Sequence, residues 1–334
     1  MIYKPGSASE IEDKKTSRMH ILVSLRCPRI HRQTPSPRTD PNYFQVVNDD
    51  GPPSHVSPYI LPFVEALQRA GHQVSVVIPA SSRSWIGKAH LIEATLQAVY
   101  IPQPTLTPTS TPTPNEPNEW VILRNGTPAS CVQLGLYNLF PETPPVDLVI
   151  SGPNHGRNAS TIYNLSSGTV GGALEAATCG TRAIAISFGS KDPQSEETIA
   201  AAARLAVRVV LALVRNWDER VELYNLNVPM RADVESRAVR YTTALPYSWS
   251  RGVLYSEVQG SGSDHVNGHD SQGDDGGDAI KQRTFKWSAE LSDMKKALQA
   301  AREGTDAHTV LNGYTRYCTL PPHHSLLLKK NNAN

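Results

Sequence analysis

Short apolar runs alternate with helix-like segments along this chain, and that alternation constrains the fold more than any other feature. We expect strands at residues 73–78, 100–101, 120–123, 146–150, 183–187 and 223–228. We expect helices at residues 58–70, 127–137, 169–178 and 196–214, where apolar or alanine-rich faces and flanking Gly and Pro residues are typical of helices. Strands that alternate with helices indicate an α/β fold, with a mostly parallel sheet covered by helices on both faces.

Two adjacent carboxylates, Asp49 and Asp50, follow a short apolar segment and precede Gly51. Ligands of α/β folds bind at the carboxyl ends of strands, and a glycine lets the backbone turn and approach a ligand closely. Adjacent acids that stay ionised repel one another, and they commonly bind a hard divalent cation. Asn, Asp and Gly are also ordinary turn residues, so a solvated turn is the alternative interpretation of residues 48–51.

Three further polar loops follow predicted strands or open a predicted helix, at residues 81–87, 151–158 and 166–173. Their small polar residues are able to coordinate a cation or to bind phosphate oxygens through backbone N–H groups. Loops of this kind that converge on one edge of a sheet form a binding site, and we expect one here.

Composition excludes several classes of protein. The 334 residues carry a formal net charge of +1, which gives no support for direct nucleic-acid binding. The four cysteines are widely spaced, so neither a zinc site nor a disulfide framework is expected. The polar N-terminus lacks the apolar core of a signal peptide, and no apolar run is long enough to span a membrane. We therefore expect a cytoplasmic protein that does not bind membranes.

We predict one large domain at residues 19–315, preceded by a disordered tail at residues 1–18. Within the domain, the Pro- and Thr-rich residues 102–118 and the Gly- and Asp-rich residues 260–278 are expected to be flexible loops. Residues 24–46 are an atypical insert, and residues 316–334 are an atypical tail.

Several motifs occur in a fixed order between about His20 and Tyr314. They are Asn48-Asp49-Asp50-Gly51, Arg83-Ser84 with Gly87, Gly126-Thr127-Pro128-Ala129, Ser151-Gly152-Pro153-Asn154 with Gly156 and Asn158, Ser167-Gly168-Thr169-Val170, Asn227-Val228-Pro229 and Gly304-Thr305-Asp306. This ordered set resembles the SurE family of metal-dependent phosphatases. Residues 84–90 and 126–136 are most similar to the fungal branch, in which a SurE-like domain often precedes a tubulin-tyrosine-ligase-like domain.

The resemblance implies a Rossmann-like three-layer sandwich with a C-terminal hairpin and helix extension. It implies hydrolysis of phosphomonoesters, typically nucleoside monophosphates, with one Mg²⁺ or Mn²⁺ ion as cofactor. That ion would be held by Asp49, Asp50, Ser84 and Asn154. Asp49, Asp50 and Asn154 would form the catalytic centre, with Asp50 as the general base. Phosphate would be bound by Asn48, Asn158, Ser167, Gly168 and Thr169.

The family also implies a homodimer or tetramer in which C-terminal hairpins, here at about residues 241–287, are exchanged between subunits. Two departures from the family pattern bear on the expected activity. Residues 24–46 separate the strand-like residues 20–23 from the acidic motif, which directly follows the first strand in the family. After Thr315 the sequence differs from the usual final strand, and Pro321 and Pro322 argue against a strand.

Two interpretations of the insert stay open: either residues 43–47 form a replacement strand, or the first strand is mispaired. Because the residues at both of its ends can be encoded by splice-site sequences, we hypothesise that the segment is a translated intron. Two other functions also stay open. One is a non-catalytic SurE-like module that binds a nucleotide or a partner. The weaker one is a dinucleotide-binding oxidoreductase, which the missing GxGxxG motif disfavours.

Overall fold

A computed structural model describes residues 42–104, 119–190, 192–249, 254–258 and 283–320. The predicted strand at residues 20–23, the tail at residues 1–18 and the loop at residues 260–278 lie outside the described residues. The same holds for most of the loop at residues 102–118 and for residues 321–334. Among the helices that the structure describes, none has the length and apolar character needed to cross a membrane.

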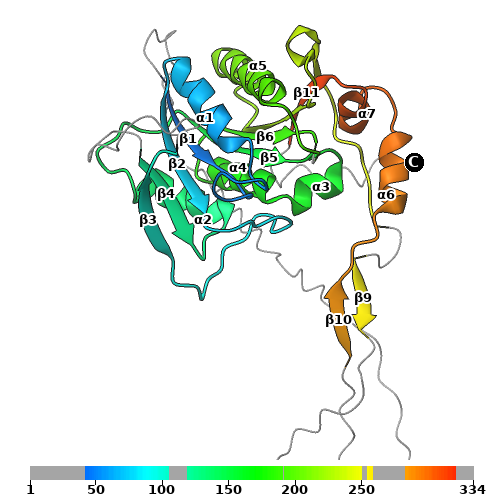
Figure 1. The fold of residues 1–334 in the computed structure, drawn as a ribbon, viewed down its shortest axis with the longest axis horizontal. Helices are drawn as coiled ribbons and strands as arrows, with labels where there is room; N and C mark the ends of the chain where they lie inside the picture. The colour runs from blue at the N-terminus through cyan, green and yellow to red at the C-terminus, as the bar shows by residue number, and fades with distance from the viewer. Residues whose placement is uncertain (1–41, 105–118, 191, 250–253, 259–282, 321–334) are drawn as a thin grey trace, which may run out of the picture. The chain divides into compact units, whose positions relative to one another are not determined.

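In the described part of the chain, nine strands form one sheet in the order β3-β4-β2-β1-β5-β6-β7-β11-β8 (Figure 1). The strands from β4 to β7 along this order run parallel, whereas β3 and β11 are antiparallel to their neighbours β4 and β7. A separate antiparallel hairpin joins β9 to β10. The strands are β1 Tyr43–Val47, β2 Gln73–Pro79, β3 Gln97–Pro102, β4 Glu119–Arg124, β5 Leu148–His155, β6 Ala183–Phe188, β7 Leu223–Val228, β8 Val239–Tyr241, β9 Tyr255–Val258, β10 Thr284–Trp287 and β11 Thr315–Thr319.

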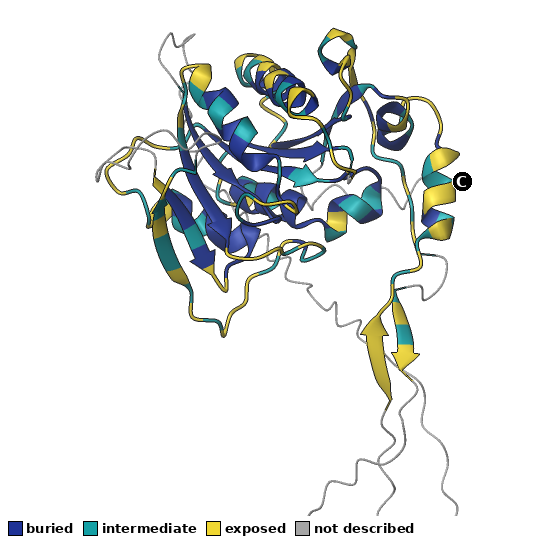
Figure 2. Cartoon of the chain, in the orientation of Figure 1, coloured by how far each residue is buried: buried dark blue, intermediate teal, exposed yellow. Residues whose placement is uncertain are grey.

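Helices cover both faces of the sheet. They are α1 Ile60–Arg69, α2 Pro128–Tyr137, α3 Thr161–Ser166, α4 Gly168–Thr178, α5 Glu196–Arg215, α6 Ser292–Gln299 and α7 Asp306–Leu311, with a 3-10 turn at Val234–Ser236. One core cluster packs α1 and α5 against the sheet, and a second packs α2 and α4 against the other face. Figure 2 shows the central strands buried and the β9–β10 hairpin largely exposed. The predicted α/β sandwich with helices on both faces is confirmed.

β1 lies at the centre of the sheet, and both of its faces are covered. Phe44 and Val46 belong to the core cluster under α1 and α5, whereas Val47 belongs to the cluster under α2 and α4. All five residues of β1 are buried, as expected for a central parallel strand. Of the two interpretations of the insert, the structure therefore contains the replacement strand. The boundary that we placed after residue 46 falls inside β1.

The C-terminal boundary also needs correction. β11 pairs with β7 and β8, so residues 316–319 belong to the sheet and not to a tail. Pro321 and Pro322 come after the strand ends and therefore do not remove its hydrogen bonds. The short helix α3 was not predicted, and β5 continues through residues 151–155, which we had assigned to a loop.

The order of the strands places the candidate site. β2 lies on one side of β1 and β5 lies on the other, so the chain changes direction across the sheet between β1 and β5. Open α/β sheets bind ligands at such a switch point, outside the carboxyl ends of the strands. Here the carboxyl ends of β1 and β5 lead to Asp49 and Asn154.

Candidate active site

The acidic motif forms a tight turn directly after β1. The side chain of Asn48 closes this turn: its amide donates to the carbonyl of Gly51 at 2.8 Å and accepts from the Gly51 N–H at 3.1 Å. Gly51 has a φ of 86°, a conformation that favours glycine. Asn48 is therefore a structural residue of the turn, and the structure does not bring its side chain into the candidate site.

Asp49 is fixed by the start of α4. The hydroxyl of Thr169 donates to Asp49 Oδ1 at 2.5 Å, and both residues are buried. A Cβ atom added at Gly168 would lie 2.9 Å from Asp49 Oδ2, so a glycine lets the start of α4 pack closely against the Asp49 side chain. Ser167 caps α4 by accepting from the N–H of Val170 at 3.1 Å. Thr169 and Gly168 therefore shape the surroundings of Asp49.

Asp50 contacts the end of β5. Its Oδ2 atom accepts from the backbone N–H of His155 at 2.7 Å. The hydroxyl of nearby Tyr59 has its pKa raised to about 12, first because it is buried and then because the charges of Asp50 and Asp192 oppose its ionisation. Tyr59 is therefore a neutral hydrogen-bond donor, and its hydroxyl donates to the carbonyl of Ser190 at 3.2 Å.

The loop after β2 carries Ser84 and is held at both ends. The N–H of Arg83 donates to the carbonyl of Asp49 at 2.6 Å, and the N–H of Gly87 donates to the carbonyl of Ser166 at 2.9 Å. Gly171 allows this close approach, because a Cβ atom there would lie 2.1 Å from the carbonyl oxygen of Gly87. The loop is thus tied to β1 and to the segment that precedes α4.

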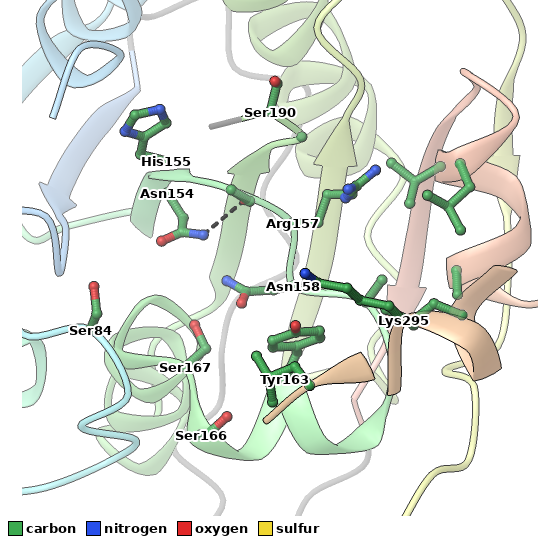
Figure 3. Close-up of a pocket in the computed structure, with 18 of the residues that line it drawn as sticks. Ser84, Asn154, His155, Arg157, Asn158, Tyr163, Ser166, Ser167, Ser190 and Lys295 are labelled. Atoms are coloured by element: carbon green, nitrogen blue, oxygen red, sulfur yellow. Dashed lines mark hydrogen bonds between the residues drawn. The ribbon is translucent and has the colours of Figure 1, made fainter. Parts of the chain in front are cut away.

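Asn154 is the second-last residue of β5, and the pairing of β5 with β6 shifts register between Ser151 and Asn154. Its amide nitrogen donates to the carbonyl of Gly156 at 2.8 Å. In Figure 3 this leaves the amide oxygen of Asn154 facing the side on which Ser84 lies. The oxygen is the atom that a cation would bind.

A cavity of about 500 Å³ joins these elements. Five of the residues predicted from the sequence line it, namely Asp49, Ser84, Asn154, Asn158 and Ser167. Asn48, Asp50, Gly168 and Thr169 are not among the lining residues, although Asp50 and Thr169 contact residues that are.

Two cationic side chains, Arg157 and Lys295, also line this cavity, and Figure 3 shows Lys295 reaching in from α6. Arg157 belongs to residues 151–158, one of the polar segments that the sequence predicts to converge on the site. Lys295 was missed, and no local motif could have identified it, because it reaches the cavity from a distant helix. Both charges suit an anionic ligand such as a phosphate group.

Asn158 is buried in a polar network behind the cavity. Its side-chain amide donates to Ser187 Oγ at 3.0 Å, and its N–H donates to Asn227 Oδ1 at 2.9 Å. Its carbonyl accepts hydrogen bonds from the side chains of Asn225, Asn227 and Arg316. The Asn158 backbone therefore holds the loop after β5 in place, and one side-chain hydrogen bond joins it to Ser187.

The residues fit a divalent cation. The predicted set offers two carboxylates, a hydroxyl and an amide oxygen, and oxygen ligands suit Mg²⁺ and Mn²⁺. Within the described ranges, no group of three or more His, Cys, Asp and Glu residues could hold a metal ion. The site would therefore depend on the oxygens of Ser84 and Asn154 as well as on the acids.

Comparison with known proteins identifies the family. A family model described as survival protein SurE matches residues 44–251, which is more than half of the chain. The chain is 31% identical over 218 residues to "5'-nucleotidase SurE" of Prochlorococcus marinus (strain MIT 9211), a match that covers 58% of this chain and 72% of that protein. It is 38% identical over 185 residues to "5'-nucleotidase SurE" of Synechococcus sp. (strain CC9311), covering 55% of this chain and 62% of that protein.

A third relative has a different name. The chain is 39% identical over 215 residues to "Probable tubulin--tyrosine ligase PBY1" of Saccharomyces cerevisiae, a match that covers 55% of this chain and 28% of that protein. The chain thus covers less than two thirds of the yeast and Synechococcus relatives. A solved structure of the SurE protein from Aquifex aeolicus shares the fold, with a TM-score of 0.58 and 24% identity over 85% of this chain and 96% of that chain. The chain belongs to the SurE family.

Proposed function

We propose that this protein is a divalent-metal-dependent phosphomonoester hydrolase that acts on nucleoside monophosphates. The observation that carries the proposal is the convergence of Asp49, Ser84 and Asn154 on one cavity that Arg157 and Lys295 also line. Such a site combines oxygen ligands for a cation with positive charges for a phosphate. The names of the bacterial relatives, which are 5'-nucleotidases, support the same reaction class.

In this proposal Asp49, Asp50, Ser84 and Asn154 hold one Mg²⁺ or Mn²⁺ ion. When bound, the ion supplies charge stabilisation to the phosphoryl group and activates water. The hydrogen bond from Thr169 to Asp49 and that from the His155 N–H to Asp50 orient the two carboxylates before substrate binds. Asp50 is the proposed acceptor of the proton from the attacking water.

The phosphate oxygens would be bound by the remaining polar groups of the cavity. Ser167 lines it at the start of α4, where backbone N–H groups and the helix dipole favour an anion. Arg157 and Lys295 add positive charge from the other side, and both stabilise the charge of the phosphoryl group in the transition state. We further propose, from the family, that the protein assembles as a homodimer or tetramer.

A second candidate function is a non-catalytic module that binds a nucleotide or a partner protein. The name of the yeast relative, which is not that of a phosphatase, favours this alternative, as does the replacement of the first strand by residues 43–47. Binding of a nucleoside monophosphate without turnover by the folded protein would distinguish this function from the first one.

The test is phosphate release from a panel of nucleoside monophosphates by the full chain, with Mg²⁺, with Mn²⁺ and with EDTA. We expect metal-dependent turnover that Asp49→Asn and Asp50→Asn each reduce by at least about a hundredfold. Glu219→Gln, at an exposed ion pair far along the sequence, is the matched acid-to-amide control and should retain full activity. Activity that survives Asp50→Asn intact, or that does not depend on metal, would overturn the proposal.

A further inference from the structure

Two aromatic side chains line the same cavity as the candidate cation ligands. Trp85 directly follows Ser84 in the chain, and Tyr163 comes from α3. Their ring centroids lie 6.0 Å apart at an interplanar angle of 67°. The cavity therefore has aromatic lining residues beside its polar end. A phosphate group alone would not need them.

The backbone of Trp85 is in an unfavourable conformation. Its φ is 63°, which is uncommon for a residue other than glycine. Residues that their surroundings hold in such a conformation are concentrated at functional sites. The surroundings do enforce it here, because hydrogen bonds hold Arg83 on one side of Trp85 and Gly87 on the other. The loop thus holds the Trp85 backbone in this conformation.

Two further aromatic rings pack against Trp85. Trp287 packs edge-on at a centroid distance of 5.2 Å, and Trp249 lies nearly parallel at 6.5 Å. Neither of these two rings lines the cavity, whereas Trp85 does and stays half-buried. Part of the Trp85 side chain is therefore available to a ligand in the cavity.

We propose that Trp85, together with Tyr163, binds the base of a nucleoside monophosphate whose phosphate lies at the Asp49, Ser84 and Asn154 end of the cavity. This inference rests on the proposed function and specifies its substrate class. Only the ribose separates phosphate from base in such a ligand, which agrees with the adjacency of Ser84 and Trp85. Every base presents a flat aromatic face, so aromatic contacts select for the presence of a base more than for its identity.

The test compares two substrates that differ only in the base. We would measure kcat/KM for adenosine 5'-monophosphate and for ribose 5-phosphate in the wild type, Trp85→Leu and Trp85→Phe. Loss of one base contact should lower the ratio of the two kcat/KM values by about tenfold in Trp85→Leu. Trp85→Phe keeps an aromatic ring and should retain most of the ratio. An unchanged ratio in Trp85→Leu would overturn the inference.

The ratio separates base binding from general damage, because displacement of Ser84 would lower turnover of both substrates equally. Phe285→Leu is a matched aromatic-to-leucine exchange at a residue that is 51% exposed and does not line the cavity, and its ratio should equal that of the wild type.

If the wild type hydrolyses neither substrate, the proposed function fails, and calorimetric binding then tests the base site alone. Tighter binding of adenosine 5'-monophosphate than of ribose 5-phosphate, with the difference lost in Trp85→Leu, would support the inference. Equal affinities in the wild type would overturn it.

Discussion

Arg316 on β11 donates a hydrogen bond from its guanidinium to the backbone carbonyl of Asn158, in the loop that lines the candidate active site. The same guanidinium lies 3.7 Å from the carboxylate of Asp306, and neither side chain has any solvent exposure. Asp306 also accepts hydrogen bonds from the N–H groups of Ser160 and Leu245, both at 2.8 Å. Residues near the C-terminal end of the described chain therefore hold the loop that follows β5.

Breaking this buried pair should destabilise the whole domain. Arg316→Ala leaves the Asp306 carboxylate buried without its positive partner, and such changes typically cost about 3–5 kcal/mol. Urea unfolding would measure the loss, with exposed Arg220→Ala as the control, because that residue's ion pair with Asp218 lies on the surface. A loss below about 1 kcal/mol for Arg316→Ala would contradict the structural role of the pair.

The hydroxyl of Thr169 should matter for metal binding because it orients Asp49. Thr169→Val keeps the shape of the side chain but removes the donor, and loss of a group that orients a metal ligand typically weakens affinity about 10–100-fold. Calorimetric titration with Mn²⁺ would measure this change. Thr169→Ser, which keeps the hydroxyl, should bind nearly as tightly as the wild type. Equal affinity in Thr169→Val and Thr169→Ser would refute the orienting role.

The sequence predicted the parts of the site that depend on strand order. Asp49 and Asn154 each follow or end an apolar run, and parallel strands bring their carboxyl ends to the same edge of the sheet, so their convergence could be anticipated. The loop that carries Ser84 follows β2, the neighbour of β1, and converges for the same reason.

The parts that the sequence missed depend on contacts without a local signature. Asn48 belongs to the same motif as Asp49, yet its side chain closes the turn. The short side-chain amide reaches the backbone of Gly51, three residues further on, and is therefore not directed at a ligand. Lys295 reaches the cavity only through the packing of α6. Arg316 looks like a surface residue in the sequence, and only the polar network around Asn158 makes its burial possible.

The ion pair between Lys88 and Glu175 should make stability depend on pH. Burial raises the pKa of Glu175, but hydrogen bonds from Gln133 and Lys88 outweigh burial and hold the pKa below its ordinary value of 4.5. A carboxyl whose pKa is lower in the folded state stabilises the fold above the pKa of the unfolded chain. That stabilisation is lost as the pH falls through the folded value.

We therefore expect Glu175→Gln to destabilise the protein by about 2 kcal/mol at pH 7 and by progressively less below pH 4.5. Free energies of unfolding at a series of pH values from 7 down to well below 4.5 would check the slope. Glu219→Gln, which removes an exposed ion pair, serves as the control and should run parallel to the wild type. A constant difference between Glu175→Gln and the wild type at all pH values would contradict the assignment.

Gln45 identifies a weak point of β1, and it bears on the hypothesis that residues 24–46 are a translated intron. Its side chain is fully buried, and although its amide nitrogen donates to the carbonyl of Cys131 at 3.0 Å, its Oε1 has no hydrogen-bond partner. A buried acceptor without a partner costs about 1–3 kcal/mol. If residues 24–46 are deleted, His20-Ile21-Leu22-Val23 directly precede Val47, and Leu22 takes the position of Gln45.

The shortened chain should therefore fold and have a melting temperature at least as high as that of the full chain, because Leu removes the unpaired polar atom at nearly constant volume. Gln45→Leu in the full chain isolates this single effect and should raise the melting temperature by itself. Thermal unfolding and phosphate release would be measured on both variants. Failure of the shortened chain to fold, while Gln45→Leu folds normally, would show that residues 24–46 contribute more than the strand and would refute the intron hypothesis.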